Sequence, residues 1–368
     1  MRIGLVVTGG VDRSGRQRVI PSLLWLIERL ARRHEVHVFA LYHEDAPCTY
    51  PLLGATVHDL GTRRVPRGWR RLVQARRLRA ALARLPRFDV LHAYWGIPAG
   101  WVAVSTGRAI DVPVVVTANS GEFVADRDRA YGFQRRWIDR HLIAQTMARA
   151  ARVTVCTAHM AALAGRHGIP TEVIPLGVPS DLFVDAARPA GPPWRLLHVG
   201  HLNRVKDQAT LLRAFAMLRA SHPDTHLDIA GGDTLDGEIQ GLARDLDLAT
   251  SITFHGAVDY AAVMALHAQA HVHVMSSRHE AAGVAVLEAA AAGVPTVGIC
   301  AGYVADWSPG AAMAVTPGDA PALARGLAAL LSDPAERLAL GLRAQARAAA
   351  MTADDSAAAF EAMYRAVL

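Results

Sequence analysis

Apolar residues follow two alternating patterns along the chain. Short runs rich in Val, Ile and Leu are typical of buried strands in a parallel sheet. Between them, apolar residues return every three or four positions, which predicts amphipathic helices. The predicted strands are Arg2–Val7, Glu35–Leu41, Phe88–His92, Val112–Thr117, Ala151–Thr157, Trp194–Val199, His226–Gly232, Ile252–Val258, His271–Met275, Val294–Gly298 and Ala311–Asp319. This succession indicates an α/β protein built on parallel sheets.

The same rhythm occurs in both halves of the chain without a tandem repeat. It indicates two doubly wound, Rossmann-like domains that face a cleft. The segment Ala186–Pro193 is rich in Pro, Gly and Ala and is the predicted linker. We therefore expect a first domain over residues 1–185 and a second over 186–353, and a length of 368 residues agrees with two domains.

The stretch His271–Gly298 is expected to hold the chemistry of the second domain. It predicts a strand, a polar loop, a helix opened by Gly283 and a further strand. Glu280 lies in the loop, and Glu288 follows eight positions later within an Ala-rich helix, where an unpartnered carboxylate would be costly. Open α/β sheets bind ligands at the carboxyl ends of strands, and a helix N-terminus favours an anion. Two carboxylates around a phosphate site can hold separate hydroxyl-bearing parts of one ligand.

The pattern E-x7-E followed by EAAAAGVP, from Glu280 to Pro295, resembles the donor-binding signature of family four retaining glycosyltransferases. This family is also called group 1 and has the two-domain GT-B fold. The resemblance implies that Glu280 contacts the transferred sugar and Glu288 the nucleotide ribose. Ala282 departs from the family, which often has Phe there, and Gly283 and Val284 complete the predicted loop.

A second loop, LHVGHLNRVKD, resembles the segment in which family members embrace the diphosphate with Arg and then Lys. Lys206 matches that lysine and is the only lysine among 39 basic residues. His201, after Gly200, stands at the usual arginine position, with Arg204 close by. A cation here stabilises charge that develops on the leaving nucleotide.

Further family positions follow from the same resemblance. The backbone of His255, Gly256 and Val258 is expected to receive the base, and Gly9 and Gly10 are expected near the diphosphate and acceptor. A final helix over residues 354–368 would cross back to the first domain, which holds the acceptor in this family.

The loop after Val112–Thr117 is expected to help position sugar and acceptor. Relatives often carry His in this loop, where this chain has Asn119. Glu122 is the nearest titratable group and the candidate base. The alternative for Glu122 is a carboxylate at a helix start or on the surface.

We expect transfer of a sugar from a nucleotide-diphosphate sugar, UDP rather than GDP, to an acceptor hydroxyl, with retention and without an essential metal or cofactor. Lys206, Arg204 and the helix start at Gly283 would replace a divalent cation. One alternative is a nucleotide-sugar 2-epimerase, in which Glu122 and His92 would be the acid–base groups. The other is a weakly catalytic subunit that binds sugar nucleotides.

Composition narrows the class of protein. A hydrophobic content of 52% and a charged content of 20% are typical of a globular chain, and no run of apolar residues predicts a spanning helix. The start MRIGLVV predicts a strand rather than a signal peptide, and three dispersed cysteines predict reduced, buried thiols. The 17 histidines lack the spacing of a metal site. We therefore expect a cytoplasmic protein.

Residues 60–88 form a basic segment without Asp or Glu. It contains ten arginines between Arg63 and Arg87, and apolar residues recur at near-helical spacing: Trp69, Leu72, Val73, Leu78, Leu82 and Leu85. One interpretation is a solvated outer helix that docks its apolar face on the sheet. The other is a face for an anionic surface, either the inner membrane face or a lipid-linked acceptor. Acceptor classes left open are a small molecule, a glycan or a lipid-linked sugar; few aromatics interleave the arginines, so no nucleic acid is expected.

Overall fold

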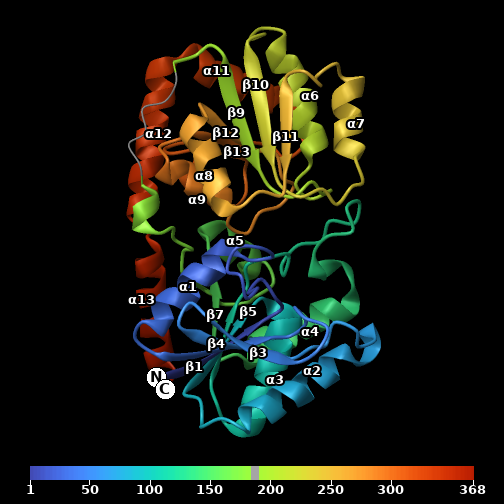
Figure 1. Ribbon diagram of the computed structural model, residues 1–368, viewed down its shortest axis with the longest axis vertical. Coiled ribbons are helices and arrows are strands. Elements are labelled where there is room, and N and C mark those ends of the chain that lie inside the picture. The colour runs from blue at the N-terminus through green and yellow to red at the C-terminus, as the bar shows by residue number, and fades with distance from the viewer. Residues whose placement is uncertain (184–189) are drawn as a thin grey trace. The chain divides into compact units, whose positions relative to one another are not determined.

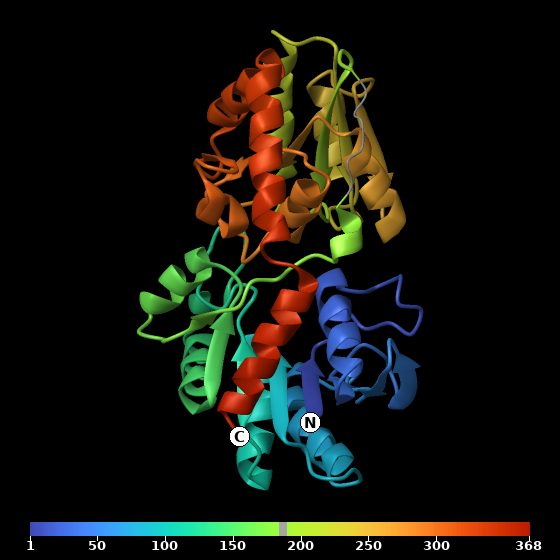
Figure 2. The ribbon, with the colours of Figure 1, turned by 90° about the vertical axis from the view of Figure 1, so that its left-hand side faces the viewer.

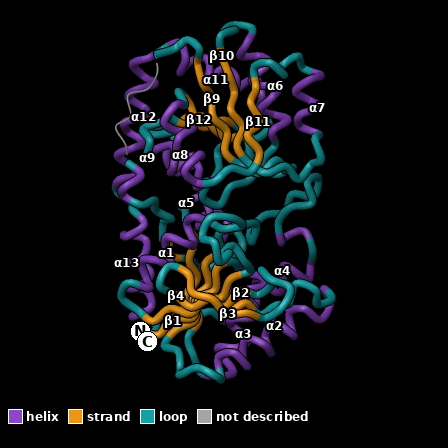
Figure 3. Tube along the Cα trace, viewed as in Figure 1, coloured by secondary structure: helices purple, strands orange, loops and turns teal. Residues whose placement is uncertain are grey.

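The computed structural model describes residues 1–183 and 190–368, which fall into two compact units. Unit 1 comprises Met1–Gly177 and Ala353–Leu368, and unit 2 comprises Val178–Thr352. The expected boundary after residue 185 and the first half of the expected linker Ala186–Pro193 lie outside the described residues. In each unit the strands gather into one sheet flanked by helices (Figure 3).

Unit 1 is built on an eight-stranded sheet with the order β3-β4-β2-β1-β5-β6-β7-β8 (Figure 1). Its strands are β1 (Arg2–Val7), β2 (Glu35–Ala40), β3 (Cys48–Leu52), β4 (Ala55–Asp59), β5 (Val90–Tyr94), β6 (Val114–Thr117), β7 (Arg152–Val155) and β8 (Glu172–Val173). All pairs are parallel except β3 with β4. The order of strands reverses direction between β1 and β5, which is a topological switch point.

The helices of unit 1 cover both faces of this sheet. They are α1 (Pro21–Ala31), α2 (Arg67–Leu82), α3 (Trp101–Ile110), α4 (Trp137–Arg149), α5 (Ala158–Gly165) and α13 (Ala353–Ala366). Helices α1 and α13 pack together, whereas α2 contacts α3 and α3 contacts α4 (Figures 1 and 2). Right-handed crossovers account for this division, because β1 connects to β2 in one direction and β4 to β5 in the other.

The last helix belongs to unit 1 although it follows unit 2 in sequence. The Tyr364 hydroxyl bonds His92 Nδ1 at 2.6 Å, and the Ser356 hydroxyl donates to the Pro175 carbonyl at 2.6 Å. Figure 2 shows α13 running beside α1. Buried polar contacts of this kind fix the position of the helix, because leaving them unmade would be costly.

Three features of the structure differ from the sequence-based expectations. The hairpin of β3 and β4 was not predicted; its two-residue turn places Leu53 and Gly54 at φ of 50° and 83°, and a leucine is unusual there. Helical spacing over residues 133–150 predicts a single helix, whereas the structure has a 3-10 turn, Phe133–Arg135, followed by α4, because Arg136 is extended. All three cysteines are free, but only Cys156 is buried as expected; Cys48 is partly buried and Cys300 is exposed.

Unit 2 is built on a six-stranded parallel sheet with the order β11-β10-β9-β12-β13-β14. Its strands are β9 (Trp194–Val199), β10 (Thr225–Ala230), β11 (Ile252–Gly256), β12 (Val272–Met275), β13 (Thr296–Ile299) and β14 (Met313–Val315). Its helices are α6 (Gln208–Arg219), α7 (Glu238–Asp245), α8 (Tyr260–Gln269), α9 (Val284–Ala291), α10 (Gly302–Trp307), α11 (Ala320–Ser332) and α12 (Pro334–Ala349).

The sheet of unit 2 is buried on both faces. Helix α6 packs with α11, and α9 packs with α12 (Figure 1). Successive strands are added on one side from β9 to β11 and on the other side from β12 to β14. The predicted fold class, two parallel-sheet α/β domains, is therefore confirmed, and the switch point of unit 2 lies between β9 and β12.

No helix among the described residues is both long enough and apolar enough to cross a membrane.

Candidate active site

The switch point of unit 2 brings two predicted residues together. Lys206 follows β9, and Glu280 follows β12, the neighbouring strand. Their side chains meet at 2.5 Å, Lys206 Nζ to Glu280 Oε1, although 74 positions separate them in sequence. The carboxyl ends of neighbouring parallel strands share one edge of the sheet, which explains this meeting.

Glu280 is a carboxylate, and one of its oxygens, Oε1, accepts hydrogen bonds from two protein side chains. The Ser277 hydroxyl also donates to Oε1, at 2.5 Å. Burial would raise the pKa of Glu280, but the Lys206 ammonium and the Ser277 hydroxyl hold it below its usual value. Because both bonds go to Oε1, the other oxygen, Oε2, is left to accept a hydroxyl from a ligand.

The loop that carries Lys206 is braced by its own side chains. The Asn203 amide oxygen accepts the backbone N–H groups of Val205 and Lys206 at 3.0 and 2.9 Å, and the Ser276 hydroxyl donates to the Lys206 carbonyl at 2.8 Å. Gly200 makes room for the lysine stem, since a Cβ there would lie 3.3 Å from Lys206 Cε. The ammonium is therefore directed at Glu280 by a loop with few conformations.

The other cations expected at this loop lie differently. Arg204 is exposed and pairs with Glu238 of α7 at 2.9 Å. His201 is exposed, with Nδ1 3.3 Å from the Gly232 carbonyl. Neither bond involves Glu280, and the role expected for Arg204 and His201 at a diphosphate stays a prediction.

Arg278 was missed by the sequence analysis. Its Nε donates to Asp207 Oδ2 at 2.5 Å, and its NH1 donates to the Pro317 carbonyl at 3.2 Å. The Arg278 N–H also donates to the Val205 carbonyl at 2.7 Å. The arginine thus ties the loop after β12 to the loop after β9. Its signal in the sequence is only its place two residues before Glu280.

The turn between Glu280 and α9 depends on glycine. Gly283 caps α9 at φ of 76°, and Gly302 has φ of 55°. A Cβ on Gly302 would lie 2.3 Å from the Ala282 carbonyl oxygen, which accepts the Tyr303 N–H at 2.8 Å. The turn therefore presents the first N–H groups of α9, from Val284 onward, in a fixed position suited to a phosphate.

Glu288 lies inside unit 2, with only 5% of its surface exposed. Burial raises the pKa of its carboxyl to about 7, and the neighbouring Tyr260 hydroxyl offsets this only in part. His267 Nε2 is 4.0 Å from Glu288 Oε2. The expectation that this carboxylate needs a partner or a ligand agrees with its burial.

The side chain of His255, in the segment expected to receive the base, is hydrogen-bonded within the protein. His255 Nε2 bonds Asp228 Oδ1 at 2.8 Å, and Arg195 binds the same buried carboxylate with two nitrogens. Gly256 ends β11 at φ of 66° and is exposed, and Val258 follows two residues later. The Gly256 carbonyl accepts the Gly231 N–H at 2.8 Å, and the expected binding of a base by this turn stays a prediction.

In unit 1, the candidate base Glu122 is a structural residue. Its carboxylate is fully buried and accepts the Gly96 N–H at 3.0 Å and the Ser120 N–H at 2.7 Å. Burial raises its pKa. It is neither the surface group nor the open base that the sequence suggested, because both oxygens anchor loops after β5 and β6. Asn119 lies near it, with its amide buried beside the Tyr94 hydroxyl.

His92, an acid–base candidate for the epimerase alternative, is also committed. Its Nε2 bonds the Thr117 hydroxyl at 2.6 Å, its Nδ1 bonds Tyr364, and burial lowers its pKa to about 3. The glycines after β1 shape a turn: Gly10 has φ of 81°, and a Cβ there would lie 2.6 Å from Ile20 Cδ1. Gly9 packs against His43.

Among the described residues, Asp12, His43 and Glu44 lie close enough to hold a metal ion. Arg18, however, pairs with Asp12 at 2.6 Å and with Glu44 at 3.2 Å. Against the effect of burial, hydrogen bonds from Ser14 hold the pKa of Asp12 well below its usual range, with smaller contributions from His43 and the Arg18 guanidinium. The arrangement is complete as an ion-pair network without a metal.

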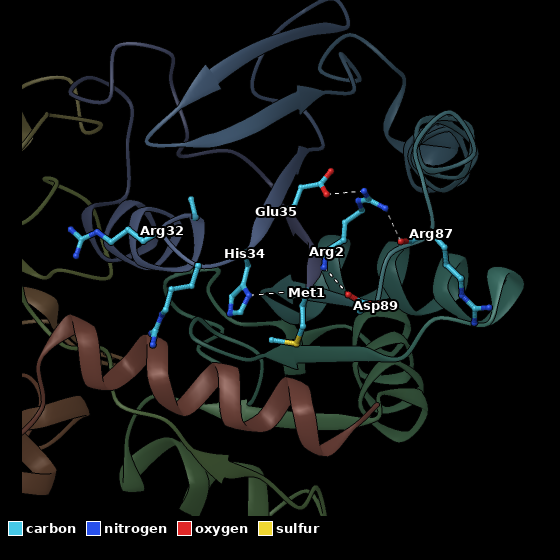
Figure 4. A pocket seen from close by; sticks show the side chains of 9 residues that line it. Met1, Arg2, Arg32, His34, Glu35, Arg87 and Asp89 are labelled. Carbon is cyan, nitrogen blue, oxygen red and sulfur yellow. Dashed lines mark hydrogen bonds and ion pairs between the residues drawn. The ribbon is translucent and has the colours of Figure 1, made fainter.

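A hollow of about 690 Å³ lies at the amino ends of β1 and β2, the edge of the sheet opposite to the ligand-binding ends. Figure 4 shows that Arg2 bonds Glu35 and the Arg87 carbonyl, whereas the side chains of Arg32 and Arg87 point away from one another. Its charges are satisfied locally and do not converge on one point, so it is not the candidate site.

Two family models account for most of the chain. Glycosyl transferase 4-like domain matches residues 19–177, and Glycosyl transferases group 1 matches residues 183–347. Glycogen synthase of Mycobacterium tuberculosis is 31% identical over 278 residues, 73% of this chain and 65% of that relative. The chain thus spans about two thirds of that curated relative. A GDP-mannose-dependent phosphatidylinositol monomannoside mannosyltransferase of Mycolicibacterium smegmatis is 34% identical over 148 residues, 37% of this chain and 38% of the relative.

Solved structures share the fold over the whole chain. Sucrose-phosphate synthase from Thermosynechococcus elongatus has a TM-score of 0.83 at 21% identity and covers 100% of this chain and 99% of its own. Anabaena HepE, in complex with UDP and glucose, has a TM-score of 0.75 at 16% identity and covers 100% of both chains. From the two family models and this GT-B fold, the chain belongs to the group 1 glycosyltransferases.

Proposed function

We propose that the chain transfers a sugar from a nucleotide-diphosphate sugar to an acceptor hydroxyl, with retention at the anomeric carbon. The observation that carries the proposal is the contact of Lys206 with Glu280 at the switch point of unit 2. An ammonium and a carboxylate, each partly exposed, neutralise one another there. A donor supplies better partners for both, since its diphosphate is anionic and its sugar carries hydroxyls.

In the proposed reaction, the acceptor oxygen attacks the anomeric carbon from the side on which the nucleotide leaves. The bond from that carbon to the diphosphate oxygen breaks, and the leaving phosphate takes the acceptor proton. Lys206 and the N–H groups at the start of α9 stabilise the charge on the diphosphate. Glu280 orients the sugar through Oε2, and Glu288 accepts the ribose hydroxyls. No protein nucleophile is required, in agreement with the commitment of Glu122 and His92 to structure.

The test is a panel of UDP- and GDP-sugars with candidate acceptors, in which NMR identifies the anomeric configuration of the product. Lys206→Ala and Glu280→Gln are expected to abolish most transfer, whereas Arg213→Ala, an exposed cation on α6, is the matched control. Transfer is expected to survive a metal chelator. Inversion at the anomeric carbon, or full activity of both site variants, would contradict the proposal.

The epimerase alternative makes a different prediction. An epimerase converts a nucleotide sugar without an acceptor. His92→Asn should then abolish activity, whereas the proposed transferase requires an acceptor and has no acid–base role for His92.

For the acceptor, we propose an anionic lipid surface or lipid-linked acceptor at helix α2. Leu78 and Leu82 dock on unit 1, but Trp69 and Leu72 are 68% and 56% exposed, so the apolar positions do not form one docked face. The arginines of α2 fall into two groups. Arg70 and Arg77 donate to backbone carbonyls, whereas Arg71, Arg76 and Arg79 have no ion pair within the described residues.

An exposed tryptophan and leucine beside unpaired arginines suit a phosphate-bearing interface, because the rings enter the headgroup region and guanidinium groups bind phosphate. The test is flotation with phosphatidylserine or phosphatidylinositol vesicles at low and high salt. Arg71→Glu with Arg76→Glu should weaken binding, and Arg213→Glu with Arg219→Glu on α6 is the charge-matched control. Equal binding to neutral vesicles, or none to anionic ones, would point to a small soluble acceptor.

A further inference from the structure

Helix α8 presents two polar side chains to Glu288. Tyr260 and His267 lie two turns apart on α8, which packs against α9. The Tyr260 hydroxyl interacts with the Glu288 carboxyl and lowers its pKa. His267 Nε2 lies 4.0 Å from Glu288 Oε2, just beyond hydrogen-bond reach.

If His267 served only to stabilise the fold, the burial of its polar ring would carry a free-energy cost without compensation. It is fully buried, and within the described residues neither of its ring nitrogens has a hydrogen-bond partner. Burial lowers its pKa to about 3, so the ring is neutral and carries one N–H. Its neighbour His273, with ring centroids 5.7 Å apart, cannot relieve it, because the His273 ring is directed to Thr296 through Nδ1. A buried donor without an acceptor requires an explanation, and a ligand-dependent movement that supplies the acceptor is one.

We propose that Tyr260 and His267 are positioning residues that hold the Glu288 carboxylate for the ribose hydroxyls of the donor nucleotide. This inference rests on the proposed role of Glu288. On nucleotide binding, the Glu288 side chain moves by about the excess of its present distance over a hydrogen bond, roughly 1 Å, and Oε2 accepts the His267 N–H. Tyr260 holds the carboxyl from its other side.

The chemical reason lies in the state of Glu288. Its pKa of about 7 leaves much of the carboxyl protonated near neutral pH. A protonated carboxyl cannot accept two ribose hydroxyls as a carboxylate does. Hydrogen bonds to the charged form favour that form, so two donors on α8 stabilise the carboxylate that the ribose requires.

The experiment measures the dissociation constants of UDP and GDP, and of their 2′,3′-dideoxy analogues, by calorimetry. For the tighter nucleotide, His267→Leu and Tyr260→Phe should each weaken binding about tenfold. Neither variant should change the affinity of the dideoxy analogue, because the hydroxyls that Glu288 accepts are absent. His267→Gln, whose side-chain amide can place an N–H near the imidazole Nε2, should restore most of the affinity.

His271→Leu is the matched control. His271 is also buried in unit 2, but its Nδ1 accepts the Arg195 N–H at the amino end of β12. This variant should lower thermal stability and leave nucleotide affinity unchanged. In transfer assays, His267→Leu should raise KM for the donor with little change in kcat, since the sugar and diphosphate contacts remain.

The outcomes separate this inference from the function on which it rests. If Glu288→Ala leaves the affinity for both nucleotides unchanged, the ribose role of Glu288 fails and the inference falls with it. If Glu288→Ala weakens binding but His267→Leu and Tyr260→Phe do not, only the inference is overturned. An equal loss for nucleotide and dideoxy analogue would also overturn it, because it would show general damage to unit 2. Should His267→Leu not fold, Tyr260→Phe with the dideoxy comparison decides the question.

Discussion

The two units have similar parallel sheets, but the polar side chains at their carboxyl edges are bonded in different ways. In unit 2, Lys206 and Glu280 meet one another and each keeps bonding capacity for a ligand. In unit 1, Glu122 and His92 are completely buried and spend their hydrogen bonds on backbone N–H groups, Thr117 and Tyr364. Polar residues at equivalent edges of similar sheets therefore have different roles: some are placed to bind a ligand, and others stabilise the fold. Their hydrogen-bond partners distinguish the two roles.

The difference has an energetic reason. A buried polar group must be satisfied within the protein, and once satisfied it has little left to offer a substrate. The Lys206–Glu280 pair keeps some exposure, 27% and 11% of the two side chains, so a ligand can reach both groups. We therefore expect substitutions in unit 2 to change donor binding and transfer, and those in unit 1 to change stability.

The largest effect is expected for Lys206→Ala. Loss of the ammonium removes stabilisation of the leaving diphosphate, and kcat/KM should fall about 10²- to 10³-fold. Initial-rate assays with the best donor measure it, and the free energy of unfolding should change little. If Lys206→Ala kept full activity, the proposed difference between the carboxyl edges of the two sheets would be wrong.

The second prediction concerns pH and Glu288. Burial raises the pKa of this carboxyl from 4.5 to about 7 in the folded chain. The folded state then binds the extra proton between those values, so the contribution to stability is full below pH 4.5 and is lost as pH rises towards 7. The loss is of the order of 3 kcal/mol at most. Glu288→Gln should lack it, and denaturant unfolding of both proteins from pH 4.5 to 7.5 tests the difference.

A smaller effect is expected for Tyr364→Phe in unit 1. The change leaves His92 Nδ1 buried without its partner, which should destabilise the protein by about 1–3 kcal/mol. Thermal unfolding measures this loss, while KM for the donor should stay the same. A change in donor KM with unaltered stability would contradict a structural role for Tyr364 and His92.

The smallest effect is expected for Arg204→Ala. The guanidinium is exposed and paired with Glu238, and exposed pairs contribute at most about 1 kcal/mol. Donor KM and kcat should each change less than about threefold. A loss as large as that of Lys206→Ala would show that Arg204 leaves Glu238 for the diphosphate, and would restore the role that its sequence position suggested.

Much of the fold could be predicted because its signals are local. Runs such as Arg2–Val7 and His271–Met275 carry the strand pattern within a few residues, and the E-x7-E spacing lies inside one loop and one helix. The hairpin at Leu53 was missed because its turn uses a residue that rarely adopts positive φ. The break at Arg136 was missed because helical spacing continues through it.

The sequence by itself determined the succession of strands and helices, the family, and the positions of Lys206, Glu280 and Glu288. Tertiary structure alone decided that Lys206 faces Glu280, that Arg204 turns to Glu238, and that Glu122 is an anchor. It also decided that Glu288 is buried beside helix α8, near Tyr260 and His267. The physical reason is that periodicity and motif spacing depend on neighbours in the chain. Burial and hydrogen-bond partnership depend on residues that only the folded sheet brings together.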